Sequence, residues 1–235
     1  MIDIHSHLLP GIDDGAKNVE ESLKMLSESF SQGVEICAAT PHCVIHRQKD
    51  LDMFLHDRKK AFAELKEAMN ADGGKFPQII LGGEVYLDND LNSYEGIEKL
   101  CYEGTNYLLL EFPVDKVNSR WAEWIYEMNR KGIKILVAHV DRYSEWEKMM
   151  ADFKGLDVIY QVNASRFCHF SDRKLLKRLM EYGHNYIISS DMHNTRGRRC
   201  NMAEAFEKAK KKYPGNADKL FDLNARKLLG FKREL

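Results

Sequence analysis

Short apolar runs rich in isoleucine, valine and leucine recur along this chain, and segments with helical periodicity separate them. Uninterrupted apolar runs are typical of parallel strands that helices cover on both faces. Strands with one wet face instead alternate polar and apolar residues. The pattern therefore predicts strands at residues 1–7, 34–40, 78–82, 107–112, 133–138, 157–163 and 186–190.

Helix signals fill most of the gaps between these strands. Asn18 and Glu21 stand three positions apart before an apolar stripe, a capping-box-like pattern that predicts a helix beginning after Asn18. This helix should end near Gly33, because glycine is the residue most often found just beyond a helix C-terminus. Further helices are predicted at about residues 51–70, 119–131, 144–152, 171–183, 200–213 and 216–229, with Gly132 and Gly183 at C-terminal cap positions.

The alternation of strands and helices indicates an α/β protein with parallel strands. No Gly-rich phosphate-binding fingerprint follows the first strand, so the pattern favours a closed (β/α) barrel of seven strands over a Rossmann-type sheet. A chain of 235 residues with 44% hydrophobic content has the size of one such barrel. We therefore expect a single domain over residues 1–235.

Two histidines near the N-terminus, His5 and His7, point to a metal site. In a strand they share one face, while Ile2 and Ile4 point to the other face, because side chains alternate with a period of two. Two imidazoles on one face can bind one cation. An isolated pair of this kind is equally consistent with strand-end histidines that bond to solvent or backbone.

The other strand ends strengthen the metal interpretation. The carboxyl ends of the strands of a (β/α) barrel form one mouth, so residues far apart in sequence converge there. Histidine and carboxylate ligands without thiolate favour Mn, Fe, Zn or Mg over a structural zinc site. The residues that the strand assignments place at this mouth are His5, His7, His42, Glu84, Glu111, His139, Asp191 and His193.

Composition narrows the classes of partner. The formal net charge of −1 at pH 7 provides no global field to attract nucleic acid or an anionic membrane. Five cysteines, an odd number without CxxC spacing, suit a reduced cytosolic protein. The sequence shows no signal-peptide pattern and no apolar run long enough to cross a bilayer. We expect a cytoplasmic protein that neither inserts into membranes nor binds nucleic acid.

The combined motifs resemble a known superfamily over essentially the whole chain. His5-x-His7, Asp14, His42, Glu84, Glu111, His139 and Asp191-x-His193 together resemble the polymerase and histidinol phosphatase (PHP) superfamily. The opening segment 1–10, Asp13-Asp14-Gly15 and segments 138–143 and 190–194 look like the metal-dependent protein tyrosine phosphatases of Gram-positive capsule and exopolysaccharide operons. The resemblance implies a distorted seven-stranded βα barrel with a trinuclear metal centre, most often of manganese.

The resemblance also assigns roles to residues. It implies one metal on His5, His7, Glu84 and Asp191, a second that shares Glu84 and adds Glu111 and His139, and a third on Asp14, His42 and His193. Arg142 and Arg198 match the family's phosphate-contacting arginines, although Arg196 and Arg199 crowd Arg198. A surface ion pair is the alternative for either arginine.

These residue types suit phosphate-ester hydrolysis. Two or three divalent ions would generate hydroxide from water near neutral pH, and arginine would stabilise the transferring phosphoryl group. By resemblance the substrate is a phosphotyrosine protein, the tyrosine-rich tail of a bacterial autokinase. Aromatic residues that could line a slot for the phenol are Tyr86, Phe112, Trp121, Trp124 and Tyr143, the two tryptophans being equally suited to the core.

Other classes of enzyme and a non-catalytic role are alternatives to this function. A cysteine-dependent tyrosine phosphatase requires Cys-x5-Arg, and no cysteine of this sequence has an arginine at that distance. A histidinol phosphatase or another small-molecule phosphoesterase would share the fold and the metals. A nuclease is disfavoured by the near-neutral charge. A non-catalytic metal-binding scaffold would tolerate missing ligands, and none is missing here.

Overall fold

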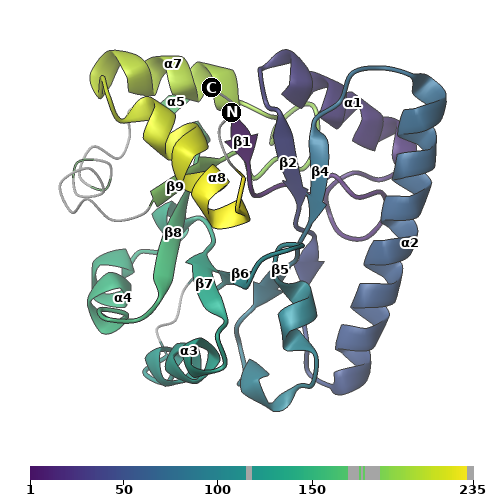
Figure 1. Ribbon diagram of the computed structural model, residues 1–235. Coiled ribbons are helices and arrows are strands. Elements are labelled where there is room, and N and C mark those ends of the chain that lie inside the picture. The colour runs from purple at the N-terminus through teal and green to yellow at the C-terminus, as the bar shows by residue number, and fades with distance from the viewer. Residues whose placement is uncertain (115–117, 169–174, 176, 178–185, 232–235) are drawn as a thin grey trace.

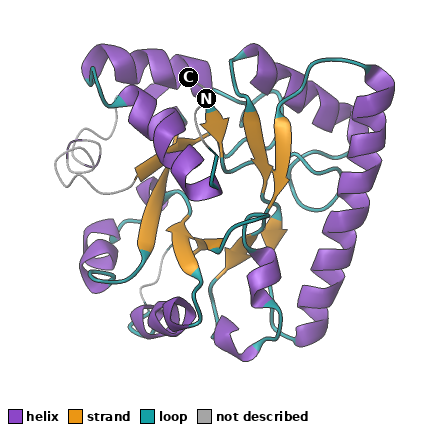
Figure 2. Cartoon of the chain, in the orientation of Figure 1, coloured by secondary structure: helices purple, strands orange, loops and turns teal. Residues whose placement is uncertain are grey.

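The computed structural model describes residues 1–114, 118–168, 175, 177 and 186–231. It is an α/β protein whose strands lie around the centre of the molecule, with α1, α2, α3, α4 and α7 outside them and α8 across the front in this view (Figure 1). The same view coloured by element type shows the strands surrounded by helices (Figure 2). This arrangement explains the apolar runs, because both faces of the strands are covered.

The strands form two parallel sheets. The smaller sheet has the order β1-β2-β4, with β1 at Ile2–Asp3, β2 at Ile36–Ala39 and β4 at Gln78–Leu81. The larger sheet has the order β3-β5-β6-β7-β8-β9, with β3 at His42–Cys43, β5 at Glu84–Tyr86, β6 at Tyr107–Glu111, β7 at Lys134–Val137, β8 at Val158–Asn163 and β9 at Tyr186–Ser189.

The break between the sheets falls at the ends of two of the expected strands, 34–40 and 78–82, and the short strands that follow it, β3 and β5, were not predicted. Pro41 interrupts the run from β2 to β3, because proline has no N–H to donate to a ladder. Gly82 and Gly83 separate β4 from β5. The Gly82 N–H donates to the Ala39 carbonyl over 2.9 Å, and the Glu84 N–H donates to the Pro41 carbonyl over 3.0 Å. The two sheets are therefore linked at the break.

The expected closed barrel is not found among the described residues. β1 covers only two of the seven residues predicted to be strand, because side-chain oxygens replace ladder partners beyond it. The Ile4 N–H donates to Ser189 Oγ and the Ser6 N–H to Thr40 Oγ1, each over 3.1 Å. In the described residues, the segments after β1 and β9 form an isolated parallel bridge between Ser6 and Met192 with hydrogen bonds beside it, and no continuous ladder joins them.

The helices agree with the sequence pattern where the structure describes them. The N-cap of α1 is confirmed, since Asn18 Oδ1 accepts from the Glu21 N–H over 2.9 Å. The prediction for 171–183, Gly183 included, lies outside the described residues except for Leu175 and Lys177. The helices are α1 (Val19–Ser31), α2 (Gln48–Asp72), α3 (Trp121–Arg130), α4 (Trp146–Asp152), α5 (Ser165–Cys168), α7 (Met202–Lys212) and α8 (Asn224–Leu229), with 3-10 turns at Leu91–Ser93, Ile97–Leu100 and Val140–Arg142 and a π-helix at Lys219–Leu223.

Apolar side chains on the two faces of the strands belong to two separate clusters. One lies between the strands and the outer helices. The other joins residues from most strands to α8, whose Ala225, Leu228 and Leu229 are buried in it. Ile2 and Ile4 lie in this second cluster, as the strand period predicts. Among the described residues, no helix is long and apolar enough to span a bilayer.

Replacing the α1 cap should weaken folding. We expect Asn18→Ala to lower the free energy of unfolding by about 1 kcal/mol, because the Glu21 N–H loses its acceptor. Denaturant titration followed by circular dichroism measures the change. Asn18→Asp keeps a capping oxygen and should stay close to the parent stability. Equal destabilisation by both substitutions would contradict a capping role.

Candidate metal centre

The nine predicted ligands come together, most of them at or next to the first or last residue of a strand. His5 and His7 follow β1, His42 begins β3, Glu84 begins β5, and Glu111 ends β6. The remaining four are His139 directly after β7, Asp191 and His193 after β9, and Asp14 in the loop before α1. Most of these side chains are buried, but Asp14 is exposed and His42 and Glu111 are partly exposed.

Glu84 lies at the centre of this cluster. Its Oε2 atom lies 3.2 Å from Nε2 of His5, 3.2 Å from Nε2 of His7 and 3.0 Å from Nδ1 of His42. Its Oε1 atom lies 2.9 Å from Nε2 of His139. Four imidazoles thus surround one carboxylate that is 1% exposed.

Two further carboxylates join the outer ligands. Asp14 Oδ1 lies 3.4 Å from Nε2 of both His42 and His193. Glu111 lies 3.4 Å from Nε2 of His139 and 3.6 Å from Nδ1 of His42. The described residues include three groups in which all potential ligand atoms of the group lie within 4.8 Å of one another. These groups are His7, Asp14, His42 and His193; His5, His7 and Glu84; and His42, Glu84 and Glu111.

Asp191 contacts two of the histidines and has an unusual backbone conformation. Its Oδ1 atom lies 3.6 Å from Nε2 of His5 and 3.5 Å from Nε2 of His7. The backbone of Asp191 has φ 55° and that of His139 has φ 30°, and these are the positive-φ residues other than glycine in the described parts of the chain. Left-handed backbone at non-glycine residues is costly and concentrates at functional sites.

The proton positions in the cluster suit a cation. Gln161 Oε1 accepts from the backbone N–H of His139, which identifies this atom as the amide oxygen, and the same oxygen lies 3.1 Å from His5 Nδ1. His7 Nδ1 lies 2.7 Å from Asp13, and His193 Nδ1 lies 3.0 Å from the Asp191 carbonyl. In the tautomer in which each Nδ1 donates its proton to its oxygen, the Nε2 lone pair faces the cluster, as metal ligation requires.

The spacing of these lone pairs also fits a cation. Nε2 of His5 and Nε2 of His7 lie 3.2 Å apart, so two acceptors face each other with no proton between them in this tautomer. Glu84 Oε2 and His193 Nε2 are buried, and no group in the described parts of the chain makes a hydrogen bond of acceptable geometry with either atom. Buried polar atoms normally have partners. A divalent ion bound to these atoms would supply the missing interactions.

Electrostatics keep the carboxylates ionised. Burial disfavours the charged form of Glu84, but His5, His139 and His42 outweigh it and hold the pKa of this carboxyl well below its usual value. The pKa of Asp191 is lowered in the same way, chiefly by His5 and His7 against its burial. Burial and the neighbouring His7 lower the pKa of His193 to about 3, so this ring stays neutral as a ligand must.

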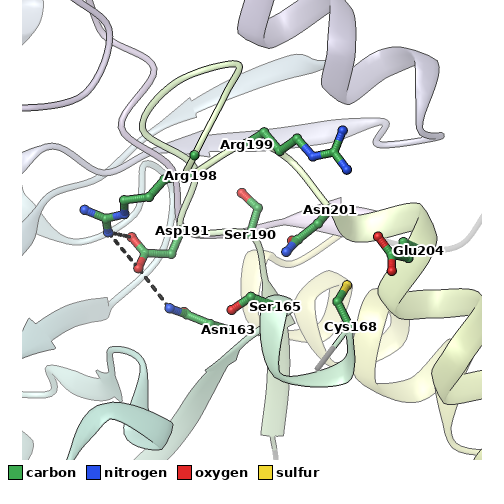
Figure 3. Close-up of a pocket in the computed structure, with 10 residues that line it drawn as sticks. Asn163, Ser165, Cys168, Ser190, Asp191, Arg198, Arg199, Asn201 and Glu204 are labelled. Carbon is green, nitrogen blue, oxygen red and sulfur yellow. Dashed lines mark hydrogen bonds and ion pairs between the residues drawn. The ribbon is translucent and has the colours of Figure 1, made fainter. Parts of the chain in front are cut away.

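Both predicted arginines lie beside the cluster. The Nη2 atom of Arg198 lies 2.9 Å from each carboxylate oxygen of Asp191, and its Nη1 atom lies 3.8 Å from Asp14 (Figure 3). Nη1 of Arg142 lies 3.9 Å from Asp191 Oδ2, and 40% of this side chain is exposed. Arg199 points away from Asp191 in the same view. Arg142 and Arg198 are therefore the guanidinium groups placed toward the ligands.

Sequence reasoning missed the residues that orient the ligands. Gln161 and Asn163 end β8, which contributes none of the predicted ligands. Gln161 Nε2 donates to Asn163 Oδ1, and Asn163 Nδ2 donates to Asp191 Oδ2. Asp13 bonds His7 and the His42 N–H, and these bonds outweigh burial to lower its pKa to about 2. Two signals in the sequence could have identified these residues. Gln161 and Asn163 are polar residues two apart in an otherwise apolar strand, and Asp13 directly precedes the predicted ligand Asp14.

Four of the aromatic residues considered for a phenol slot belong to the core. Phe112, Trp121, Trp124 and Tyr143 are all less than 6% exposed. Phe112 packs edge-to-face against Trp121, and the Tyr143 hydroxyl accepts from the Phe112 N–H over 3.0 Å. Their side chains are occupied in packing, so they cannot form an accessible slot.

Comparison with known proteins places the chain among capsule-synthesis proteins. A family model described as capsular polysaccharide synthesis, CpsB/CapC, matches residues 1–230. The tyrosine-protein phosphatase CpsB of Streptococcus pneumoniae is 30% identical over 245 residues, which cover 97% of this chain and 98% of the relative. The tyrosine-protein phosphatase CpsB of Streptococcus agalactiae serotype III (strain NEM316) is 28% identical over 256 residues, with the same coverage.

A solved structure supports the fold. It comes from work on YwqE from Bacillus subtilis and CpsB from Streptococcus pneumoniae, which are described as unique metal-dependent tyrosine phosphatases. The match has a TM-score of 0.83 at 23% sequence identity and covers 100% of this chain and 96% of that chain. The arrangement of elements is therefore shared with that protein.

Removing the β8 support should weaken cation binding. We expect Gln161→Ala to reduce affinity for Mn²⁺ by about 10- to 100-fold, because His5 loses the acceptor that orients its ring. Equilibrium titration of the chelated protein with Mn²⁺ measures the change. Gln78→Ala, at an exposed glutamine that begins β4, is the matched control and should bind as the parent does. Parent-like affinity in Gln161→Ala would show that the ligands hold their own orientation.

Proposed function

Because this chain belongs to the CpsB/CapC family of capsular polysaccharide synthesis, we propose that it is a metal-dependent protein tyrosine phosphatase. The observation that carries this proposal is the convergence of four imidazoles on the buried carboxylate of Glu84. The enzyme works as a single domain over residues 1–235. Its two parallel sheets correspond to two arcs of one distorted seven-stranded barrel.

The cluster holds two or three divalent ions, with Mn²⁺ as the native metal and Fe, Zn or Mg as alternatives. All nine residues act as ligands: His5, His7, Asp14, His42, Glu84, Glu111, His139, Asp191 and His193. The spacing of the groups supports shared ligands, since His7, His42 and Glu84 each belong to two of the three sets of potential ligand atoms. When bound, such ions lower the pKa of water toward 7 and neutralise charge on phosphoryl oxygens.

The chain's own residues bind and orient the phosphoryl group. Arg142 extends its partly exposed guanidinium toward the cluster and binds phosphoryl oxygens as they gain charge. Arg198 is held by both oxygens of Asp191, which keeps its guanidinium beside the ligands. Asp13 and Gln161 keep the Nδ1 protons of His7 and His5 away from the centre throughout.

The leaving group matches this set of residues. A tyrosine phenol has a pKa of about 10, so it departs as an oxyanion with less need for a proton donor than an aliphatic alcohol has. The histidines and carboxylates nearest the reacting phosphate are held as ligands, and the two arginines do not give up a proton near neutral pH. An aryl phosphate is therefore the substrate that this site hydrolyses best.

The substrate protein is the tyrosine-rich tail of a bacterial tyrosine kinase, and hydrolysis of its phosphotyrosines regulates capsule or exopolysaccharide synthesis. The two CpsB relatives are named tyrosine-protein phosphatases, which supports a phosphoprotein substrate. All five cysteines are free thiols in the structure, which suits a reducing compartment. We therefore place the enzyme in the cytoplasm.

Removing the central carboxylate should abolish catalysis. We expect Glu84→Ala to lose nearly all phosphotyrosine turnover and most bound metal, since three imidazoles face its Oε2 atom. Elemental analysis per chain and a phosphotyrosine-peptide assay measure the two effects. Chelation of the parent should abolish its turnover, and Mn²⁺ should restore it. An active parent enzyme free of metal would contradict the proposal.

Replacing Arg142 should separate phosphoryl binding from metal assembly. We expect Arg142→Ala to keep its metal and to lower kcat/KM by about a hundredfold or more, comparable to the loss of one oxyanion donor at about 3 kcal/mol. Arg142→Lys should recover only part of the loss, because an ammonium lacks the planar fork of guanidinium. Steady-state kinetics on a phosphotyrosine peptide, with metal analysis, provide the measurement.

The control for this substitution is Arg130→Ala. Arg130 pairs with Glu127 on the surface of α3, and its side chain is 64% exposed, so its loss should leave kcat/KM unchanged. Parent-like kinetics in the metal-loaded Arg142→Ala protein would assign Arg142 to a surface ion pair.

A further inference from the structure

A pocket beside the metal centre remains unassigned. It has a volume of about 370 Å³ and lies between the loop at residues 10–12 and helix α2. We propose that this pocket, lined by Pro10, Ile12, His42, Phe54 and Ala61, holds the aromatic ring of the phosphotyrosine substrate. This inference rests on the proposed phosphatase function and adds the residues that select an aryl substrate.

The pocket adjoins the cluster at two points. His42 lines it, and 32% of this side chain is exposed, whereas the other four histidines of the cluster are at most 1% exposed. Phe54 packs against Gly83, the residue before Glu84, since a Cβ placed on Gly83 would lie 3.3 Å from the ring. When the ring of a phosphotyrosine binds in this pocket, its phosphate therefore lies toward His42 and the rest of the cluster.

One part of the lining suits a phenyl group. Pro10, Ile12, Phe54 and Ala61 provide an apolar patch near His42, while the charged residues Asp57, Lys60 and Glu64 of α2 also line the pocket, and polar atoms contribute the larger part of its exposed surface. The volume falls in the usual range of small-molecule pockets. An aliphatic phosphate such as phosphoserine would leave the apolar part unfilled.

The Phe54 wall is held in place before any substrate binds. Arg58, one turn further along α2, lies 5.7 Å from the centroid of the Phe54 ring. Its guanidinium donates to the carbonyls of Gly82 over 2.6 Å and Lys99 over 2.9 Å. A ring fixed between Arg58 and Gly83 loses little conformational freedom when a second ring packs against it.

The second pocket at this centre suits a different chemistry. It lies on the Asp191 side of the cluster, and Asn163, Ser165, Ser190 and Asn201 are among the residues that line it (Figure 3). None of the described residues that line it is aromatic, whereas Phe54 lines the pocket beside His42. The aromatic wall makes the pocket beside His42 the better site for the phenol ring.

Binding of two phosphonates tests the proposal independently of turnover. Calorimetry on the Mn²⁺-loaded protein would compare phenylphosphonate with methylphosphonate, which share the anionic group and differ in the ring. We expect the parent to bind phenylphosphonate about tenfold more tightly or better. Phe54→Ala and Ile12→Ala should each lose most of this ratio, while affinity for methylphosphonate stays within about twofold.

Two further variants separate ring binding from folding. Phe54→Leu keeps apolar volume for packing on Gly83 and should retain part of the ratio even if Phe54→Ala is unstable. Met53→Ala is the matched control, because Met53 is the neighbouring apolar residue of α2, is 60% exposed and does not line the pocket. It should keep the full ratio.

The outcomes distinguish this inference from the proposed function. Equal binding of the two phosphonates by the parent, or an unchanged ratio in both Ile12→Ala and Phe54→Leu, would overturn the ring site even if the protein hydrolyses phosphotyrosine. A parent that prefers phenylphosphonate, loses that preference on substitution and yet fails to hydrolyse phosphotyrosine would overturn the proposed function and leave the ring site standing.

Discussion

The burial of Glu84 among four histidines is the constraint on which the rest of this structure depends. An ionised carboxylate away from water is costly unless opposite charge or a cation compensates it. Here the surrounding ring nitrogens belong to three segments of the chain, and the cation that they would bind supplies the compensating charge. Each of those segments must therefore bring its histidines to the same point, and neighbouring parallel strands with adjacent termini allow this.

Support for the ligands comes from residues that bind no substrate. Asp3 accepts from the N–H and the hydroxyl of Ser190, which holds the chain directly before the left-handed Asp191. Gln161 joins His5 to the backbone of His139, the second left-handed residue. These bonds offset the cost of the unfavourable backbone, which a flexible loop would relieve by moving. Rigid strand ends thus carry the precision of the site.

The two sides of the centre differ in character. Arg198 and the pocket lined by Asn163 and Ser190 lie on the Asp191 side, whereas Phe54 and the pocket between residues 10–12 and α2 lie on the His42 side. An aryl phosphate has a similar division, with charged oxygens at one end and an aromatic ring at the other. Arg58 and Gly83 fix the Phe54 ring, and Asp191 fixes Arg198. Under the proposed ring site, the His42 side selects an aryl substrate, while the ligands serve the reaction itself.

The sequence by itself determined the α/β alternation, the Asn18 cap and the positions of histidines and carboxylates at strand ends, because strand period and capping are local properties. It predicted the residues of the site by motif resemblance and by their place after apolar runs. Only the tertiary structure decided that the strands split into two sheets at Pro41 and Gly82–Gly83. It also decided which aromatic residues are core, that Gln161 orients His5, and that Phe54 packs on Gly83, the residue before Glu84. These features depend on contacts between segments that are distant in the sequence. The periodicity of one segment does not show which other segment packs against it.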